Sequence, residues 1–539
     1  MRRLAAIAIA LWAATAAASD IRAYWVDTFH TPLGSHADVD RVISLMAQSR
    51  ANAIFVEVRR RGDSWYLDSK EPLTEVEGVG EPDANGQWTF DPLRYMIERA
   101  HANAIQVHAF VIVGAVFRGD PTKVLPKDPK HVFLQHIWDA GNGRPFSGEQ
   151  QWATRSLPVK TRGLSYNGYR HGEEWYIDLG HPEAASYTID VLLHLIHSYD
   201  LDGIHLDRMR YPETPAGAHV GYNDVSVERF KARYGDQAKY DAAGYPRSND
   251  PLWNQWRRDQ VTQFLRRLYL HATAMKPSII VSAALVAWAS GPTRSGGFDE
   301  TDAYTRVFQD WEGWLREGVL DVASPMLYKR EHVARERKQF DDWLAFVTKT
   351  AHEHDRLAIA GIGAYMNGIE GTLRQGRRAR EAGADGILMF AVGDTAPWST
   401  ADNSTNSAVK RNPYFSPAPG SATPKRPNED FVAAVASGKN AKGTLRFEDR
   451  RRAPIFSLDA PAPSKQPPTT GSVMGYTHLD GATITIESVD SHVRQNTLTD
   501  GSGFFGFAKV APGEYHIQNC VVQVTAGQVS RVDLPCTNN

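Results

Sequence analysis

The chain has 539 residues, of which 42% are hydrophobic and 10% aromatic, and its formal net charge at pH 7 is −2. This length exceeds one compact core of ordinary size, so we expect a large domain and a smaller one. The near-neutral charge and the lack of a long basic run argue against nucleic acid and anionic membranes as main partners.

The first residues have the pattern of a secretory signal peptide. Arg2 and Arg3 precede an apolar run from Leu4 to about Ala18 that ends in small residues. The run is too short to span a bilayer comfortably, and no other segment is a candidate for a membrane span. We therefore expect residues 1–19 to be removed and the mature protein to be secreted or periplasmic.

Residues 20–415 alternate apolar, β-branched runs with amphipathic helical stretches, which indicates repeated βα units around a parallel sheet. Eight such runs predict a (β/α)8 barrel, the TIM-barrel fold of the α/β class. The predicted strands are 21–29, 51–59, 105–113, 202–208, 279–288, 321–328, 357–365 and 385–392.

The connection after the third strand is unusually long. Residues 114–174 show no clear periodicity, and a loop of this length is usually functional or disordered. Its aromatic side chains favour order, and they either stack on sugar rings or form a small satellite hydrophobic cluster. These residues are Phe133, Trp138, Phe146, Trp152, Tyr166 and Tyr169.

Residues 416–470 are rich in Pro, Ala and Ser, which predicts a linker with one short helix in the stretch NEDFVAAVASG. Residues 471–539 alternate with period two between DG and PG turns, which predicts a small β-sandwich. Cys520 and Cys536 are the only cysteines, and their proximity suits a disulfide in an oxidising compartment.

This C-terminal segment resembles the carboxypeptidase regulatory-like domain, a transthyretin-like sandwich, through DGATITIES, TLTDGSGFFGF and VAPGEYHIQ. The resemblance implies an accessory role in adhesion or support, without catalysis.

Reactive groups of a (β/α)8 barrel gather at the C-terminal ends of the strands, where the βα loops converge. Carboxylates, arginines and aromatic rings at these ends suit glycoside hydrolysis, in which one carboxylic acid protonates the leaving oxygen and a second carboxylate attacks or activates water. The candidates in chain order are Asp27, Glu57, Arg59, Asp178, Asp207, Arg210, Trp288, Tyr328, Tyr365 and Asp394.

Three carboxylates are the candidate catalytic groups. Asp207, beside Arg210 or Arg59, should remain ionised and act as nucleophile or base, because a nearby cation favours the charged form. Glu57 lies in an apolar run, so burial could hold its proton and make it the acid. The opposite assignment stays open. Asp178 is a substitute acid, or else a cap of the helix that follows it.

The other candidates are expected to bind substrate or orient the carboxylates, although core packing explains aromatic residues nearly as often. The histidines provide no convincing zinc ligand set, so neither a metal nor another cofactor is expected. The residues expected to bind substrate are Arg59, Arg210, Asp27, Trp288, Tyr328, Tyr365 and Asp394.

The barrel region resembles the glycoside hydrolase-like family ten, a group of exported bacterial barrel proteins, through IRAYWVDTF, ANAIFVEVRRRGDSWYLDS, YIDLGHPEAASY, LDGIHLDRMRYP and DVASPMLY. The resemblance implies hydrolysis of glycosidic bonds, with bacterial cell-wall glycan as one substrate. It matches Asp207, Asp178 and Tyr328 to family positions. The chain departs from the family at Arg208, where a second acid is common, and at Glu57, where Gln is common.

The sequence therefore predicts an exported glycoside hydrolase that acts on a polysaccharide, with peptidoglycan glycan strands as one candidate substrate. Two alternatives stay open. One is a non-catalytic glycan-binding or scaffolding barrel that has lost a carboxylate at Arg208, and the other is an α-glucan hydrolase. The oligomeric state is not predicted.

Overall fold

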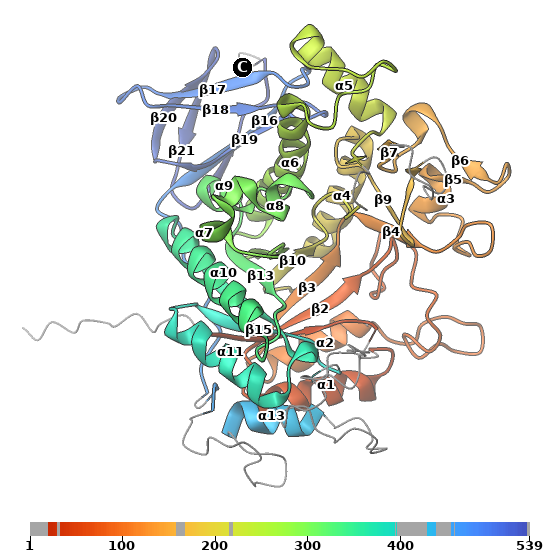
Figure 1. The fold of residues 1–539 in the computed structure, drawn as a ribbon, viewed down its shortest axis with the longest axis vertical. Helices are drawn as coiled ribbons and strands as arrows, with labels where there is room; N and C mark the ends of the chain where they lie inside the picture. The colour runs from red at the N-terminus through yellow and green to blue at the C-terminus, as the bar shows by residue number, and fades with distance from the viewer. Residues whose placement is uncertain are drawn as a thin grey trace, which may run out of the picture.

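A computed structural model describes residues 20–29, 33–157, 168–214, 219–393, 395, 428–437, 454–456 and 459–535. The predicted signal peptide, residues 1–19, lies outside this part of the chain. In the part that is described, a large body of strands and helices carries a group of C-terminal strands on one side (Figure 1). No helix among these residues is long and apolar enough to cross a lipid bilayer.

The barrel strands are β1 Ile21–Val26, β2 Ala53–Arg59, β3 Gln106–Ile112, β10 Gly203–Asp207, β12 Ile280–Leu285, β13 Val322–Leu327, β14 Leu357–Gly363 and β15 Gly386–Phe390. Within the described residues these eight strands close into one barrel, and each pairs in parallel with the barrel strands before and after it. β15 pairs back onto β1, which completes the ring. The predicted (β/α)8 fold is confirmed.

Side chains of the barrel strands alternate between the interior and the surrounding helices, because successive strand residues point to opposite faces. In β2, Phe55 belongs to the inner core of the barrel, whereas Ile54 and Val56 belong to the outer core. The period-two pattern therefore decides which residues face the barrel interior.

Glycine is required at the start of β10, because a Cβ on Gly203 would come within 2.1 Å of His108 Nδ1 on the neighbouring strand.

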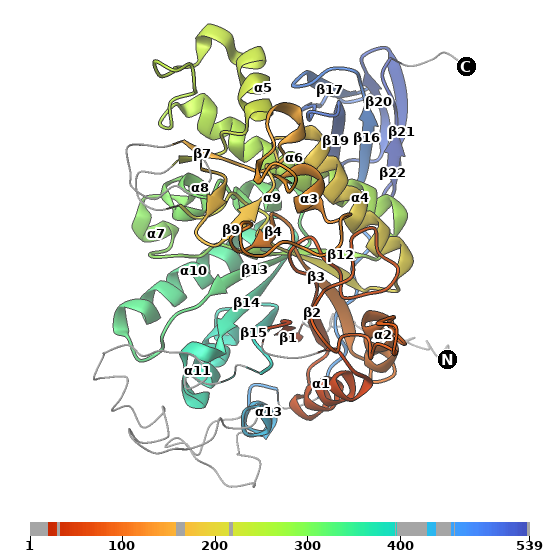
Figure 2. The same cartoon turned by 90° about the vertical axis from the view of Figure 1, so that its right-hand side faces the viewer.

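Helices after the strands surround the barrel (Figure 2). The first begins with a capping box, in which the Ser35 and Asp38 side chains each accept a hydrogen bond from the other residue's backbone N–H. Asp91 and Asp250 cap two further helices that carry Pro in the first turn. The main helices are α1 His36–Ser49, α2 Pro92–His101, α4 Pro182–Ser198, α5 Asp224–Tyr234, α6 Pro251–Met275, α9 Trp311–Glu317, α10 Ala334–Glu353 and α11 Ile369–Glu381.

The long connection after β3 is an ordered insertion. Its elements are β4 Ala115–Arg118, α3 Val132–His136, β5 Trp138–Asp139, β6 Arg144–Pro145, β7 Ser156–Leu157, β8 Arg170–His171 and β9 Glu174–Tyr176. β4, β9 and β8 form a three-stranded sheet.

The aromatic side chains of this insertion are mostly buried. Phe133, Trp138, Trp152 and Tyr169 are each at most 6% exposed and belong to the main hydrophobic core. They therefore pack as a hydrophobic cluster and are not available for stacking on a sugar. Phe146 is partly exposed, and Tyr166 lies outside the described residues.

The predicted helix of the linker is present as α13, Asn428–Ser437, which lies beside α1 at one end of the molecule (Figure 1). Phe431 on this helix contacts Tyr24 of β1 edge to face, with 6.4 Å between the ring centroids. Phe431 and Val432 are buried in the main hydrophobic core. This helix is therefore part of the packed body.

Residues 459–470, called the strap below, cross the N-terminal ends of the barrel strands. Asn52 Nδ2, just before β2, donates to Ala460 O at 3.1 Å. Lys465 Nζ donates to the main chain just before β12 at 3.0 Å and to the Asp321 carboxylate, just before β13, at 2.8 Å. The strap leads toward the C-terminal strands, which lie at the opposite end of the molecule from α13 (Figure 1).

The C-terminal strands form two sheets, one of three strands and one of four in the described residues. Residues from both sheets, such as Val473, Ile486 and Phe505, belong to one buried cluster. Cys520 is on β21, but Cys536 lies outside the described residues, so their disulfide stays a prediction. The strands are β16 Gly471–Tyr476, β17 Thr483–Ser488, β18 Arg494–Leu498, β19 Phe504–Val510, β20 Gly513–Ile517, β21 Cys520–Val524 and β22 Val529–Arg531.

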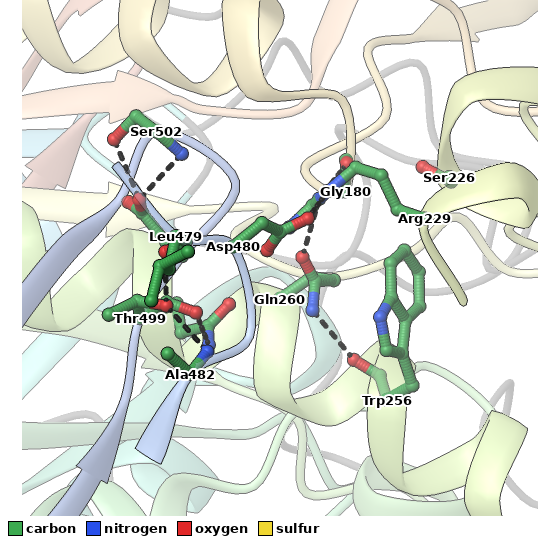
Figure 3. A network of polar contacts seen from close by, with 12 residues as sticks. Gly180, Ser226, Arg229, Trp256, Gln260, Leu479, Asp480, Ala482, Thr499 and Ser502 are labelled. Carbon is green, nitrogen blue, oxygen red and sulfur yellow. Dashed lines mark hydrogen bonds and ion pairs between the residues drawn. The ribbon is translucent and has the colours of Figure 1, made fainter. Parts of the chain in front are cut away.

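These sheets contact α5 and α6 through a polar network (Figure 3). Arg229 on α5 donates two hydrogen bonds to Asp480, at 2.7 and 2.8 Å, and a third to Gln260 at 3.0 Å. Gly506 lets β19 approach α6 closely, because a Cβ there would lie 2.2 Å from Leu270 Cδ1. The C-terminal strands therefore pack directly on the barrel helices.

Candidate active site

Four side chains lie at the C-terminal ends of the barrel strands, at positions whose alternation with their neighbours faces them toward the barrel interior. This end of the barrel is called the mouth below. Asp27 follows β1, Glu57 and Asp207 lie on β2 and β10, and Tyr328 follows β13. Burial is the main cause that raises the pKa of Tyr328, and Tyr365, Asp207 and Asp27 add to the rise. β2 and β10 are the two neighbours of β3, so their axes are about 10 Å apart.

Glu57 is 1% exposed, which confirms its expected burial. Thr28 N and Thr28 Oγ1 both donate to Glu57 Oε2, at 2.8 and 2.6 Å, while Oε1 has no hydrogen-bond partner among the described residues. Burial raises the pKa of Glu57 to about 7, although the Thr28 hydrogen bonds and the charge of Arg60 act in the opposite direction. A carboxyl group with this pKa is about half protonated at neutral pH, as a general acid requires.

Asp207 ends β10, and its Oδ1 accepts a hydrogen bond from Arg208 N at 2.6 Å. Burial raises the pKa of Asp207 above its ordinary value, and the charge of Arg210 offsets part of this rise. The charge of Arg210 acts in the expected direction, but desolvation outweighs it, so the net shift of this pKa is upward. That Asp207 stays ionised remains a prediction. Arg210 favours ionised Asp207, whereas at Glu57 the charge of Arg60 favours the ionised form and the smaller effect of Asp27 opposes it, so burial is what raises the pKa of Glu57.

Arg59 is paired elsewhere, so its expected contact with Asp207 is wrong. Its Nε and Nη2 donate to the two carboxylate oxygens of Glu71, each at 2.7 Å, and the side chain is fully buried. The pairing of β2 with β3 shifts register between Glu57 and Arg59, and such a bulge re-aims the side chain. Arg59 therefore holds the loop after β2 in place.

Arg60 and Arg61, which the sequence analysis did not single out, stand near Glu57. The Arg60 guanidinium carbon lies 3.2 Å from the ring centroid of Phe29, and Nη1 donates to Thr28 Oγ1 at 3.4 Å. Burial, followed by the charge of Arg61, lowers the pKa of Arg60 to about 10. Residues 59–61 are three consecutive arginines, and only the bulge distinguishes the buried one from those beside Glu57.

Glu174 on β9 is a second residue that the sequence analysis missed. Arg208 Nη1 donates to the Glu174 carboxylate and to Tyr176 OH, the latter at 2.7 Å, and Arg61 Nη2 donates to Glu174 at 3.2 Å. Arg208 thus fastens the insertion to the mouth. Glu174 follows a Gly-Glu turn at the end of the long connection, a stretch that gives no periodic signal in the sequence.

Aromatic rings lie at the ends of β12, β13 and β14, as expected. The guanidinium carbon of Arg210 lies 5.3 Å from the ring centroid of Trp288, which is partly exposed. Tyr328 and Tyr365 are partly exposed and meet edge to face at 5.9 Å, and both contact Phe390. These rings supply the apolar surface that a sugar-binding cleft uses.

Asp178 is fully buried and has a different set of partners. Its Oδ1 accepts hydrogen bonds from Gly180 N at 2.8 Å, Ser226 Oγ at 3.0 Å and Tyr211 OH at 3.4 Å. Burial raises the pKa of Asp178. These contacts join the turn before α4 to α5 and to the segment after β10, which favours a structural role over that of substitute acid. Asp394 lies outside the described residues.

In the described part of the chain, no group of three or more His, Cys, Asp or Glu side chains could hold a metal ion. Glu57 and Asp207 each keep one carboxylate oxygen without a protein partner in that same part. The mouth therefore holds two carboxyl groups, and glycoside hydrolysis uses a pair of such groups.

Known proteins are similar to this chain at low identity. The glycosyl hydrolase YngK of Bacillus subtilis is 23% identical over 286 residues, which cover 51% of this chain and 46% of that protein. The glycosyl hydrolase DigH of Escherichia coli is 22% identical over 290 residues, which cover 51% of this chain and 54% of that protein. The match thus spans about half the length of these relatives.

Among solved structures, the glycoside hydrolase domain of PgaB from Bordetella bronchiseptica aligns with a TM-score of 0.48 at 15% identity. The alignment covers 69% of this chain and 94% of that domain. Residues 20–365, well over half of the chain, match the family described as glycosyl hydrolase-like 10. The chain therefore belongs to the glycosyl hydrolase-like 10 family.

Proposed function

We propose that the protein is an exported glycoside hydrolase in which Glu57 is the general acid and Asp207 the nucleophile or base. Membership of the family supports a glycan-acting, hydrolase-like protein. The observation that carries the assignment is the position of the two carboxyl groups at the mouth, on the two strands that flank β3. Asp178 and Arg59 have no part in this proposal, since both are committed to buried contacts.

In the proposed reaction, Glu57 Oε1 gives its proton to the glycosidic oxygen as the bond to the anomeric carbon breaks. Asp207 either attacks that carbon directly or removes a proton from an attacking water. Direct attack forms a covalent glycosyl ester on Asp207, which a water deprotonated by Glu57 then hydrolyses, so that two inversions retain the anomeric configuration. A single attack by water inverts it. The stereochemistry of the product therefore reports which role Asp207 has.

The proposed substrate is a polysaccharide outside the cytoplasm, with peptidoglycan glycan strands as the first candidate. A signal peptide at residues 1–19 would bring the enzyme to the compartment that holds this glycan. The C-terminal strands, proposed to be a β-sandwich with a Cys520–Cys536 disulfide, would act as an accessory to the barrel.

The test is to incubate residues 20–539, and the Asp207→Asn and Glu57→Gln variants, with peptide-free peptidoglycan glycan and a panel of soluble polysaccharides that includes α-glucans. Product masses identify cleavage, and polarimetry or NMR gives the product anomer. We expect products from the parent protein. We expect kcat to fall about 10²–10⁴-fold in Glu57→Gln, with glycan binding retained.

Three results would contradict the proposal in different ways. Equal turnover by Asp207→Asn would remove Asp207 from the chemistry. Binding by all three proteins without product from any would favour the non-catalytic glycan-binding barrel. Cleavage of α-glucans alone would replace cell-wall glycan as the substrate.

A further inference from the structure

A cavity of about 370 Å³ lies beside the mouth, between the loop after β2 and the insertion after β3. This volume is in the range of pockets that hold small ligands. Its walls carry three guanidinium groups, those of Arg60, Arg61 and Arg118, and two carboxylates, those of Asp63 and Glu75. The cavity is thus richer in positive than in negative charge.

Both carboxylates in the wall are engaged by the backbone. Asp63 Oδ1 accepts from Arg61 N at 3.1 Å, and Glu75 Oε1 accepts from Lys127 N. Two of the arginines form ion pairs with carboxylates outside the cavity wall. Arg118 pairs with Glu173, and Arg61 pairs with Glu174.

Arg60 differs from these two arginines because it forms no ion pair in the described part of the chain. Its polar contact is with Thr28 Oγ1, and the Nε atoms of Arg60 and Arg61 are buried without a hydrogen-bond partner among the described residues. The Phe29 ring below Arg60 is 51% exposed. Burial and then the charge of Arg61 lower the pKa of Arg60, while the carboxylates of Glu57, Asp63 and Asp27 act in the opposite direction. An anion bound by both guanidinium groups would reduce the repulsion between the two arginines.

We propose that this cavity is an anionic subsite, in which Arg60, supported by Arg61, binds the carboxylate of an acidic sugar residue next to the bond at Glu57. A guanidinium group suits this ligand because its planar fork can donate two parallel hydrogen bonds to a carboxylate. Phe29 does not line the cavity, but beside it the part of this ring that Arg60 leaves exposed offers an apolar surface to the sugar ring. Only the position of the scissile bond rests on the proposed function.

Binding to the catalytically blocked Asp207→Asn protein tests this subsite without turnover. The probes are peptide-free peptidoglycan glycan fragments, which carry lactyl carboxylates, and trigalacturonic acid. Each is compared with its methylamide form, which has lost the negative charge. We expect calorimetry to show about tenfold or greater preference for the carboxylate form of at least one probe. Adding Arg60→Gln should abolish this preference, whereas the control Arg41→Gln, on the outer helix α1, should keep it.

Equal affinity for carboxylate and methylamide forms, or a preference that survives Arg60→Gln, would overturn the subsite. Arg60→Lys keeps the positive charge but not the planar fork, so it should retain part of the preference. That result would show that the loss of preference in Arg60→Gln does not come from misfolding. The two proposals fail separately. If the preference depends on Arg60 but the parent protein cleaves no glycan, the proposed hydrolase activity is wrong and the subsite is supported. If the parent protein cleaves glycan without a preference for the carboxylate form, the subsite is wrong and the hydrolase activity is supported.

Discussion

The pKa of Glu57 results from opposing local effects, and a single neighbouring residue contributes much of the opposition. Burial at the end of β2 raises this pKa, and both hydrogen bonds that stabilise the ionised carboxylate come from Thr28. Arg60 stabilises the same charge from the other side. The protonation of the proposed acid can therefore be altered without changing the carboxyl group itself.

Replacing Thr28 with Val removes the Oγ1 donor and preserves the shape of the side chain. Because that hydrogen bond lowers the pKa of Glu57, we expect the pKa to rise above about 7. A general acid is active when protonated, so kcat/KM should fall as pH rises through this pKa. The alkaline limb of the pH profile should therefore move to higher pH, by about half to one pH unit. A limb that stays in place would show that Glu57 is not the acid.

At the scale of elements, the insertion after β3 is fastened to the mouth by one partly buried cluster. Arg208, in the left-handed region at φ 51, and Arg61 both bind Glu174 on β9. Gly114 makes the approach possible, because a Cβ there would lie 3.0 Å from Arg208 O and 3.1 Å from the Tyr176 ring. Arg208 thus has a positioning role.

Arg208→Gln should loosen this insertion, because Glu174 would lose a charged partner in a partly buried position. We expect the free energy of unfolding to fall by about 1–3 kcal/mol and hydrogen exchange to quicken in residues 170–176. Arg118→Gln is the matched control, since Arg118 pairs with Glu173 on the same insertion but in solvent, where a pair contributes less than about 1 kcal/mol. Equal effects of the two variants would contradict the positioning role.

The same elements show what the sequence could and could not predict. The barrel strands were predictable because their apolar runs follow from burial on both faces, and their ends place Asp27, Glu57 and Asp207 at one mouth. The roles of Arg59 and Arg60 were not, because a one-residue bulge reverses which of them faces Glu57. The burial of Trp138 and Trp152 depends on tertiary packing, which local patterns do not reveal.

At the scale of the whole molecule, two of the contacts that join the C-terminal strands to the barrel lie in separate places. One is the network of Arg229, Asp480 and Gln260 beside α5 and α6 (Figure 3). The other is the strap, whose Lys465 is buried against Asp321 beneath the barrel. Asp321 also accepts from Tyr269 OH at 3.0 Å, so the strap is tied to α6 and β13 together.

Lys465→Met should weaken the strap, because it removes the cation nearest to a buried carboxylate. Both side chains of the Lys465–Asp321 pair are 8% exposed, and breaking such a pair from one side costs about 3 kcal/mol. Arg356, with Nη1 3.6 Å from Asp321, remains as a second cation and should reduce this loss. We expect a lower free energy of unfolding in urea and faster cleavage within residues 459–470 by proteinase K, a protease of broad specificity. Lys349→Met, at an exposed position on α10, should change neither.

The pattern of cleavage separates two ways in which the molecule can open. Cleavage in the strap that is faster than global unfolding means that the strap detaches by itself while the Arg229–Asp480 contact still holds the C-terminal strands on α5. Cleavage that only follows global unfolding means that strap, barrel and C-terminal strands form one cooperative unit. Unchanged stability and cleavage in Lys465→Met would show that the strap is held by its backbone contacts, with Asp321 satisfied by Tyr269 and by Val281 N.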